Sequence, residues 1–383
     1  MRVGVVAASA RWMASSLATG GVEVAAADLF ADRDLVEAAD RVDRIDNYPD
    51  GFPAWLAELA PTLWLYGGGL ENHPPLLAEM AAISPLAGTP PEALLAVRSL
   101  EPLAMAAREA GLGMPASLAS SRGVPTDGSF LVKPQASAGG RGIRPWHGGR
   151  SPPRSIWQRR VTGEPHSVSL VIDHEGRCEL LGVTGQFVGH PATHAGPFAY
   201  AGSVTLASQP AWADPFVRLC GILARRHGLL GAVGIDAVLD PTGRPWLIEL
   251  NPRPTASMEL LERQRGGPIL CDHLAACGFV VPRPPASTPS PPIHHAKAIL
   301  FAREPLRIDE RAIAEIDCRR AAWREDDGGS EAIADLPPLG TAVQAGRPVV
   351  SVLAVGGTPA AATARLLGRL GEIEAACLSR PVA

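Results

Sequence analysis

The chain has 383 residues, 46% of them hydrophobic and 19% charged, which is typical of a globular protein with two or three domains. The formal net charge of −4 and the lack of a basic block argue against nucleic acid as a partner, so we expect small-molecule partners. No uncharged apolar run reaches the roughly 18 residues of a membrane span, and the opening MRVGVV starts a strand instead of a signal peptide. We therefore expect a cytoplasmic protein with no membrane partner.

Lysine and cysteine usage is also informative. Of the 35 basic residues only Lys133 and Lys297 are lysines. Lysine carries a compact charge that the planar guanidinium of arginine does not reproduce, so both are candidates for specific roles. The six cysteines show no CxxC spacing, which indicates reduced structural thiols and neither a disulfide framework nor a zinc site.

The first 95 residues alternate between strand and helix patterns. Strands are predicted at 2–7, 22–27 and 62–66, with helices at 10–19 and after Pro75. This βαβ order predicts a parallel sheet with ligand-facing loops at the strand ends. The fingerprint GxGxxG is missing after the first strand, so we do not expect an NAD site.

The loop Gly67–His73, GGGLENH, follows the third of these strands. Its glycines permit close backbone approach, which makes it a candidate substrate contact. The alternative is a flexible turn in which Glu71 is solvated.

A second unit begins with helical periodicity over 94–111 and continues with strands at 130–133, 155–160 and 167–173. Between the first two of these strands, the loop Ser137–Gly142 contains three glycines in six residues. Such a backbone can fold its N–H groups around phosphate oxygens, and Lys133 lies just upstream to meet the same charge. No Walker A sequence occurs, so a P-loop enzyme is not expected.

A β-hairpin is predicted within 231–255, with its turn at Asp240-Pro241-Thr242-Gly243. If Asp240 faces Gly243, then Asp236 lies opposite Leu247 and diagonal to Glu249. The apolar face of the second strand would be formed by Trp246, Ile248 and Leu250.

The opposite face of this hairpin would gather Asp236, Glu249 and Asn251. Oxygen ligands on a rigid sheet suit a hard cation such as Mg²⁺. The alternative is a solvent-exposed polar face of an antiparallel hairpin. The stiff exit Asn251-Pro252-Arg253-Pro254 fixes where Arg253 points, and an arginine beside a metal-phosphate site can clamp negative charge.

The remaining chain is predicted to contain helices at 258–263 and 269–277, a Pro/Ser-rich linker at 281–292, and strands that end in a helix at 359–376. The pair His294 and His295 is interpreted as packing or surface rather than as metal ligands.

The motifs FLVKP, SAGGRG, WQRRVTGE, GIDAVLD and LIELNPR, in this order, resemble those of ATP-grasp enzymes over about residues 95–275. The resemblance implies an α/β protein with the α+β ATP-grasp fold. It would comprise an N-terminal parallel-sheet pre-ATP-grasp domain (1–95), a two-lobed ATP-grasp core (96–280), a linker (281–292), and a small C-terminal β-rich block with a terminal helix (293–383).

The resemblance also implies roles for single residues. Lys133 and Arg253 would be catalytic, with Arg253 on the transferred phosphate. Asp236, Glu249 and Asn251 would bind Mg²⁺, with Mn²⁺ as an alternative ion. Arg98 stands where the family has a lysine. The implied ATP-binding residues are Arg98, Lys133, Ser137, Gly139, Gly140, Gly142, Gln158, Arg159, Arg160, Val161, Glu164 and His166.

The activity implied is that of an ADP-forming carboxylate–amine ligase that makes an amide through an acyl phosphate. The segments YGGGLENHPPLL and ADLPPLGTAVQAGRPVVSVLA are similar to those of predicted carboligases related to biotin carboxylase, including relatives associated with methanopterin and methanofuran in one-carbon metabolism. This closer resemblance implies a role in cofactor biosynthesis, with glutamate or a similar amino acid joined to a pterin or furan precursor. The alternative is a non-catalytic ATP-grasp module that binds a nucleotide or a pterin-type cofactor. A homodimer is a candidate assembly.

Overall fold

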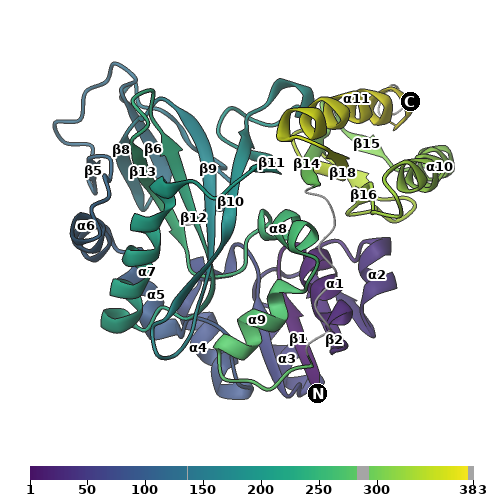
Figure 1. Cartoon of the computed structure of the whole chain (residues 1–383), viewed down its shortest axis with the longest axis horizontal. Helices are drawn as coiled ribbons and strands as arrows, with labels where there is room; N and C mark the ends of the chain where they lie inside the picture. Colours follow the sequence, from purple (N-terminus) through teal and green to yellow (C-terminus); the bar gives the residue numbers. More distant parts are fainter. Residues whose placement is uncertain (136, 283–292, 378–383) are drawn as a thin grey trace.

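The computed structural model describes residues 1–135, 137–282 and 293–377. Its strands form a four-stranded sheet near the N-terminus, a second four-stranded sheet, an eight-stranded sheet and a small two-stranded one. In Figure 1 the N-terminal part (purple) lies below the C-terminal part (yellow), and helix α8 (Met258–Arg265) lies between them near the centre of the molecule.

The N-terminal sheet is parallel, as the βαβ pattern predicts, with strand order β3-β2-β1-β4. Its strands β1, β2 and β4 are mostly apolar because helices cover both faces, whereas the edge strand β3 is Arg-Val-Asp-Arg. The elements are β1 (Arg2–Val6), α1 (Arg11–Thr19), β2 (Glu23–Asp28), α2 (Arg33–Ala38), β3 (Arg41–Arg44), α3 (Phe52–Leu59), β4 (Leu63–Tyr66), η1 (Leu70–Asn72) and α4 (Pro74–Ile83).

The helical stretch predicted over 94–111 is two helices, α5 (Pro91–Arg98) and α6 (Leu100–Glu109). The break falls at Ser99, whose backbone is extended with ψ 139°. Pro102 explains it, because its ring lacks an N–H to donate to the Arg98 carbonyl and would collide with that carbonyl in a continuous helix. The prediction of one helix is therefore wrong at this position.

The second four-stranded sheet is antiparallel, with strand order β5-β8-β6-β7. The tryptophans Trp146 and Trp157 meet edge to face in its small core, together with Val124 and Val132. The strands are β5 (Ser117–Leu118), β6 (Phe130–Pro134), β7 (Arg144–Pro145) and β8 (Ser155–Arg159). The predicted strands at 130–133 and 155–160 are thus confirmed as neighbours.

The eight-stranded sheet has the order β13-β12-β9-β10-β11-β14-β18-β16. The amphipathic helix α7 (Asp214–His227) packs on one face, while α8 and α9 (Ile269–Ala276) pack on the other. The strands are β9 (Glu164–Ile172), β10 (Cys178–Val188), β11 (Tyr200–Thr205), β12 (Gly231–Leu239), β13 (Pro245–Asn251), β14 (His294–Phe301), β16 (Ile333–Ala334) and β18 (Pro348–Gly356).

The C-terminal strands continue this sheet, because β14 pairs with β11. Helices α10 (Glu310–Asp326) and α11 (Pro359–Cys377) cover them, and β15 (Leu306–Arg307) pairs with β17 (Ala342–Val343). His294 and His295 are buried on β14, which agrees with the packing interpretation. Most of the predicted linker, residues 283–292, lies outside the described residues, and the domain limits at 95, 280 and 292 stay predictions.

No helix among the described residues is long and apolar enough to cross a membrane. The described residues form no disulfide, and they include the side chains of five cysteines between Cys178 and Cys318.

A buried ionic cluster joins the N-terminal helices to α8 and to the C-terminal strands. Arg11 binds Glu259 through two hydrogen bonds of 2.7 and 3.0 Å and donates from Nε to Asp335 at 3.0 Å. Lys297 lies 2.7 Å from Glu259 and 3.3 Å from Asp335. Burial alone would raise the pKa of the Glu259 carboxyl, but Arg11 and Lys297 outweigh burial and hold that pKa well below its usual range.

Replacement of Arg11 by alanine is expected to lower the free energy of unfolding by about 3 kcal/mol, because it leaves the buried Glu259 and Asp335 carboxylates undercompensated. The shift in the urea midpoint measures this loss. Arg2→Ala is the control, since Arg2 pairs with Glu23 at the surface with half of its side chain exposed, and should cost less than about 1 kcal/mol. Equal midpoint shifts for the two variants would contradict the assignment.

Candidate functional site

The hairpin β12–β13 forms as predicted, but its register differs. Asp236 pairs with Glu249 and not with Leu247, because a β-bulge follows Asp236 and leaves Ile248 without a direct partner. The extra residue also exchanges the faces of the part of β13 that precedes it, so that Leu247 joins Leu250 in the core and Ile248 is only partly buried. The predicted register is therefore wrong, the predicted apolar face is confirmed for Leu250 but wrong for Trp246 and Ile248, and the two carboxylates are direct cross-strand neighbours.

Asp236, Glu249 and Asn251 do converge on one face of the sheet. The Asn251 side-chain amide donates to Asp236 at 3.3 Å, and Gln186 of β10 donates to the other Asp236 oxygen at 2.8 Å. Burial raises the pKa of the Asp236 carboxyl, and the charge of Glu249 raises it further. A cation placed between the two carboxylates would relieve both effects.

The donor set fits Mg²⁺, which binds through one or two carboxylates and leaves positions for water and substrate phosphates. Residues 1–135, 137–282 and 293–377 contain no group of three or more His, Cys, Asp or Glu side chains that could hold a metal. An ion at the hairpin would be held by only two carboxylates, Asp236 and Glu249, with the Asn251 amide oxygen and oxygens of a substrate as further ligands.

Lys133 lies at the same place, although it belongs to the other sheet. Its Nζ is 3.9 Å from Glu249 and donates to Gln158 at 3.2 Å. The side chain is only 10% exposed, so its position is well defined by packing. The structure thus brings the predicted lysine to the predicted carboxylates from two separate sheets.

The loop Ser137–Gly142 lies between β6, the strand that carries Lys133, and β7. Gly139, Gly140 and Gly142 all have positive φ angles of 62–77°, which glycine adopts without strain. The Gly139 carbonyl accepts from the backbone N–H of Tyr200 at 3.2 Å, and the Ser137 carbonyl accepts from Asn72 at 3.3 Å. The loop therefore contacts both the large sheet and the N-terminal domain.

Arg253 follows β13 and is held against the N-terminal loop Gly67–His73. Its Nε donates to Glu71 at 2.9 Å, and its terminal nitrogens donate to Asn251 at 3.2 Å and to the Pro254 carbonyl at 3.1 Å. Glu71 is buried, so the alternative of a solvated Glu71 in a flexible turn is wrong. Arg98 donates to the Glu71 carbonyl at 2.8 Å and to Asn72 at 3.0 Å, which places it in the same network.

The remaining predicted ATP-binding residues lie around the junction of β8 and β9. Gln158 is buried and contacts Lys133. Arg159 ends β8, and Arg160 and Val161 lie in the connection from this strand to β9 of the large sheet. His166 lies on the sheet face opposite Asp236, because it pairs with Ala237 and packs its ring against Trp212 at 5.3 Å. Glu164 is exposed beside the hairpin turn, paired with Leu239, so neither joins the carboxylate cluster.

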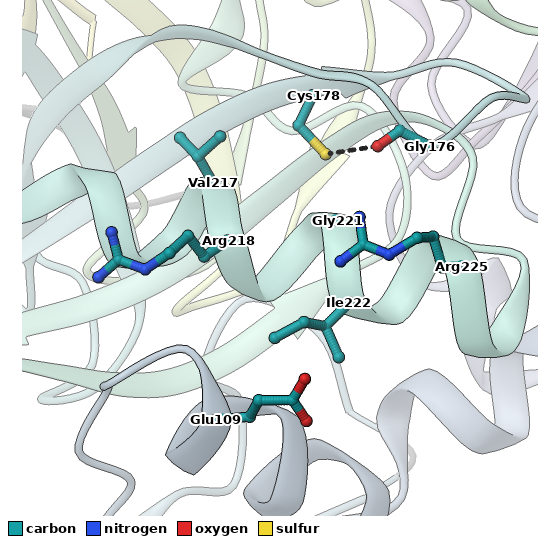
Figure 2. A pocket seen from close by; sticks show the side chains of 8 residues that line it. All are labelled: Glu109, Gly176, Cys178, Val217, Arg218, Gly221, Ile222 and Arg225. Carbon is teal, nitrogen blue, oxygen red and sulfur yellow. Dashed lines mark hydrogen bonds between the residues drawn. The ribbon is translucent and has the colours of Figure 1, made fainter.

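A surface groove of about 450 Å³ lies elsewhere, between α6 and α7 (Figure 2). Glu109, Arg218 and Arg225 line it, and Cys178 beside it contacts the Gly176 carbonyl at 3.7 Å. None of the predicted site residues lines this groove, and α7 covers the face of the sheet opposite Asp236. The groove therefore plays no part in the candidate site.

A family model described as an ATP-grasp domain matches residues 103–257, the stretch that carries Lys133, the glycine loop and the hairpin. The search of curated proteins finds no match.

Solved structures resemble the whole chain at low sequence identity. The biotin carboxylase domain of 2-oxoglutarate carboxylase from Hydrogenobacter thermophilus has 13% identity and a TM-score of 0.69, over 94% of this chain and 88% of that chain. L-amino acid ligase from Bacillus licheniformis has 13% identity and a TM-score of 0.67, over 97% of both chains. N5-carboxyaminoimidazole ribonucleotide synthetase from Thermotoga maritima has 13% identity and a TM-score of 0.63, over 97% of this chain and 98% of that chain. The chain therefore has the ATP-grasp fold, as expected.

Several residues of the site escaped sequence analysis. Gln186 lies on β10, for which no strand was predicted, and its contact with Asp236 depends on the order of strands in the sheet. Asn72 belongs to the candidate loop Gly67–His73 but was given no role of its own. No local pattern indicates that its side chain donates to the Ser137 carbonyl.

Replacement of Gly140 by alanine should disrupt the glycine loop, because a Cβ there would lie 1.8 Å from the Phe198 carbonyl oxygen at a backbone φ of +77°. We expect at least a tenfold weaker affinity for MgADP, measured by calorimetry, with an unchanged unfolding temperature. Gly149→Ala is the control, since a Cβ there meets nothing within 4 Å although φ is +85°. Equal affinities of the two variants would show that the loop does not bind phosphate.

Proposed function

We propose that the protein is an ADP-forming carboxylate–amine ligase whose active site lies between the hairpin β12–β13, the glycine loop and Arg253. The observation that carries this proposal is the convergence of Lys133, Asp236, Glu249, Asn251 and Arg253 from separate sheets onto one place. The match of residues 103–257 to an ATP-grasp domain supports the same reading.

In the proposed reaction a carboxylate oxygen attacks the γ-phosphorus of ATP, and the bond from that phosphorus to the bridging oxygen breaks to release ADP. An amine nitrogen then attacks the acyl carbon, loses a proton, and displaces inorganic phosphate to leave an amide. Bound Mg²⁺, or Mn²⁺, would neutralise phosphate charge at the carboxylates. Lys133 and Arg253 would stabilise the charge that develops on the transferred group.

The proposed nucleotide site extends from this centre to the junction of β8 and β9. The main chain of 158–161 would contact adenine, Glu164 or His166 would contact ribose, and the glycine loop with Arg98 would face the phosphates. Glu164 and His166 are two residues apart on β9 and share the sheet face opposite Asp236, so both ribose candidates are kept.

The finer proposal is that the amine or acid belongs to a pterin- or furan-type one-carbon cofactor precursor, with glutamate or a similar amino acid as the other substrate. Its support is the sequence resemblance of the loop Gly67–His73 and of the segment 334–354. Bicarbonate is a second candidate carboxylate, because the structure of the Hydrogenobacter thermophilus domain contains MgADP and bicarbonate. ADP release with bicarbonate alone, compared with release in the presence of amino acids, separates the two. A cytoplasmic location and a homodimer are parts of the same proposal.

Glu249→Gln should abolish Mg²⁺-dependent ADP formation, because the amide keeps the shape of the side chain but removes the charge next to Asp236. The rate should fall at least a thousandfold, while circular dichroism and the unfolding temperature stay those of the wild type. A folded variant with unchanged turnover would end the metal assignment.

Lys133→Arg should impair the reaction almost as much as Lys133→Ala, by about 2 kcal/mol or more in transition-state stabilisation. The wider guanidinium has to fit between Gln158 and Glu249, where the lysine side chain is only 10% exposed. ADP formation and hydroxylamine-trapped acyl phosphate are the two measurements.

The matched control for the Lys133→Arg exchange is Arg177→Lys, because Arg177 is exposed and forms surface ion pairs with Asp173 and Glu175. Lys297 is unsuitable as a control, since it is buried in the ionic cluster with Glu259. If Lys133→Arg kept near-normal rates for both signals, a compact charge at this position would not be required.

A further inference from the structure

Glu71 is a buried carboxylate at the carboxyl end of the N-terminal sheet, with 3% of its surface exposed. Both of its oxygens are engaged, one by Arg253 Nε at 2.9 Å and the other by the backbone N–H of Gly69 at 2.7 Å. A carboxylate held from two sides has one orientation, so the partner guanidinium is held as well.

The hydrogen bonds of Arg253 leave a defined part of its guanidinium free. Nε is used by Glu71, one N–H of Nη1 by the Pro254 carbonyl, and one N–H of Nη2 by Asn251. A guanidinium has five N–H groups, so one on each terminal nitrogen has no partner in this network. The contact of Nη2 with Asn251 brings this guanidinium next to a residue of the proposed metal site.

The loop around Glu71 is built for close approach to Arg253. A Cβ on Gly68 would lie only 3.2 Å from the Arg253 Cζ and Nη2 atoms, so a larger residue would displace the guanidinium. Arg98 also holds the loop, because it donates hydrogen bonds to the Glu71 carbonyl and to the Asn72 side chain. Asn72 in turn donates to the Ser137 carbonyl of the glycine loop.

We propose that Glu71 is a positioning residue, which holds Arg253 so that its two free donors face the phosphoryl group that is transferred. Through Glu71 the N-terminal domain then takes part in phosphoryl transfer without contacting ATP. This inference rests on the proposed function, and it assigns to the loop Gly67–His73 the role of a support for Arg253.

A double-mutant cycle tests the proposal. Glu71→Ala should lower kcat about 10- to 100-fold and leave the KM for ATP within about threefold, because the loss is confined to the transferred phosphate. Glu71→Gln, which can still accept from Nε, should lose less. In an Arg253→Ala background, Glu71→Ala should add less than about a twofold change, since its effect passes through Arg253.

The matched control is Glu79→Gln, an exposed glutamate on α4 near the same loop, which should leave kcat unchanged. Independent, multiplying losses from Glu71→Ala and Arg253→Ala would overturn the proposal, because a merely structural role would give this result. A higher kcat in Glu71→Ala would also overturn it, since Glu71 would then only neutralise Arg253.

A binding measurement keeps the test separate from the proposed function. The ratio of affinities for the β,γ-imido analogue of ATP and for ADP reports contacts to the third phosphate, whether or not turnover occurs. Glu71→Ala should reduce this ratio about two- to threefold, in line with the small change expected in the KM for ATP, and should not reduce it further once Arg253 is alanine. If the wild type releases no ADP with any acceptor, the ligase proposal fails and this ratio still decides the role of Glu71. An unchanged ratio in Glu71→Ala would overturn the positioning role.

Discussion

Two carboxylates on adjacent strands, Asp236 and Glu249, impose the central constraint on this structure. They are direct cross-strand neighbours, and burial and the charge of Glu249 both raise the pKa of the Asp236 carboxyl. Four side chains surround them. Gln186 and Asn251 donate hydrogen bonds to Asp236, and Lys133 and Arg253 carry positive charges. A divalent cation would relieve the repulsion between the two carboxylates, and phosphates attached to it would meet the positive charges of Lys133 and Arg253.

The predictable part of the fold is the part with strong local patterns. Parallel strands at 2–7 and 22–27 were predicted because buried strands of such sheets are continuous apolar runs. The hairpin was predicted from its Asp-Pro-Thr-Gly turn, but the bulge beside Asp236 leaves no local signal, and one extra residue is enough to exchange the faces of the part of β13 that precedes it. Contacts such as Gln186 with Asp236 depend on strand order, which local patterns do not specify.

The segment from β13 to α8 connects the candidate site to the rest of the molecule. Glu249 and Asn251 belong to the large sheet, Arg253 contacts Glu71 near the N-terminal sheet, and Glu259 binds Arg11 of α1 and Lys297 of the C-terminal strand β14. This short segment thus connects the hairpin, the N-terminal part and the C-terminal strands. The stiff prolines on either side of Arg253 reduce the number of conformations available to this segment in the unfolded chain, which favours the ordered arrangement.

The two lysines illustrate how composition and structure inform one another. Both are buried, and each lies against a glutamate of this same segment, Lys133 near Glu249 and Lys297 near Glu259. A guanidinium needs room for a planar fork, whereas an ammonium group fits a narrow space and can turn its three donors toward several acceptors. Lys297 uses this to contact Glu259 and Asp335 together, and Lys133 to lie between Gln158 and Glu249. The scarcity of lysine therefore indicated two buried positions, and only the fold distinguishes the lysine beside the candidate site from the one in the ionic cluster.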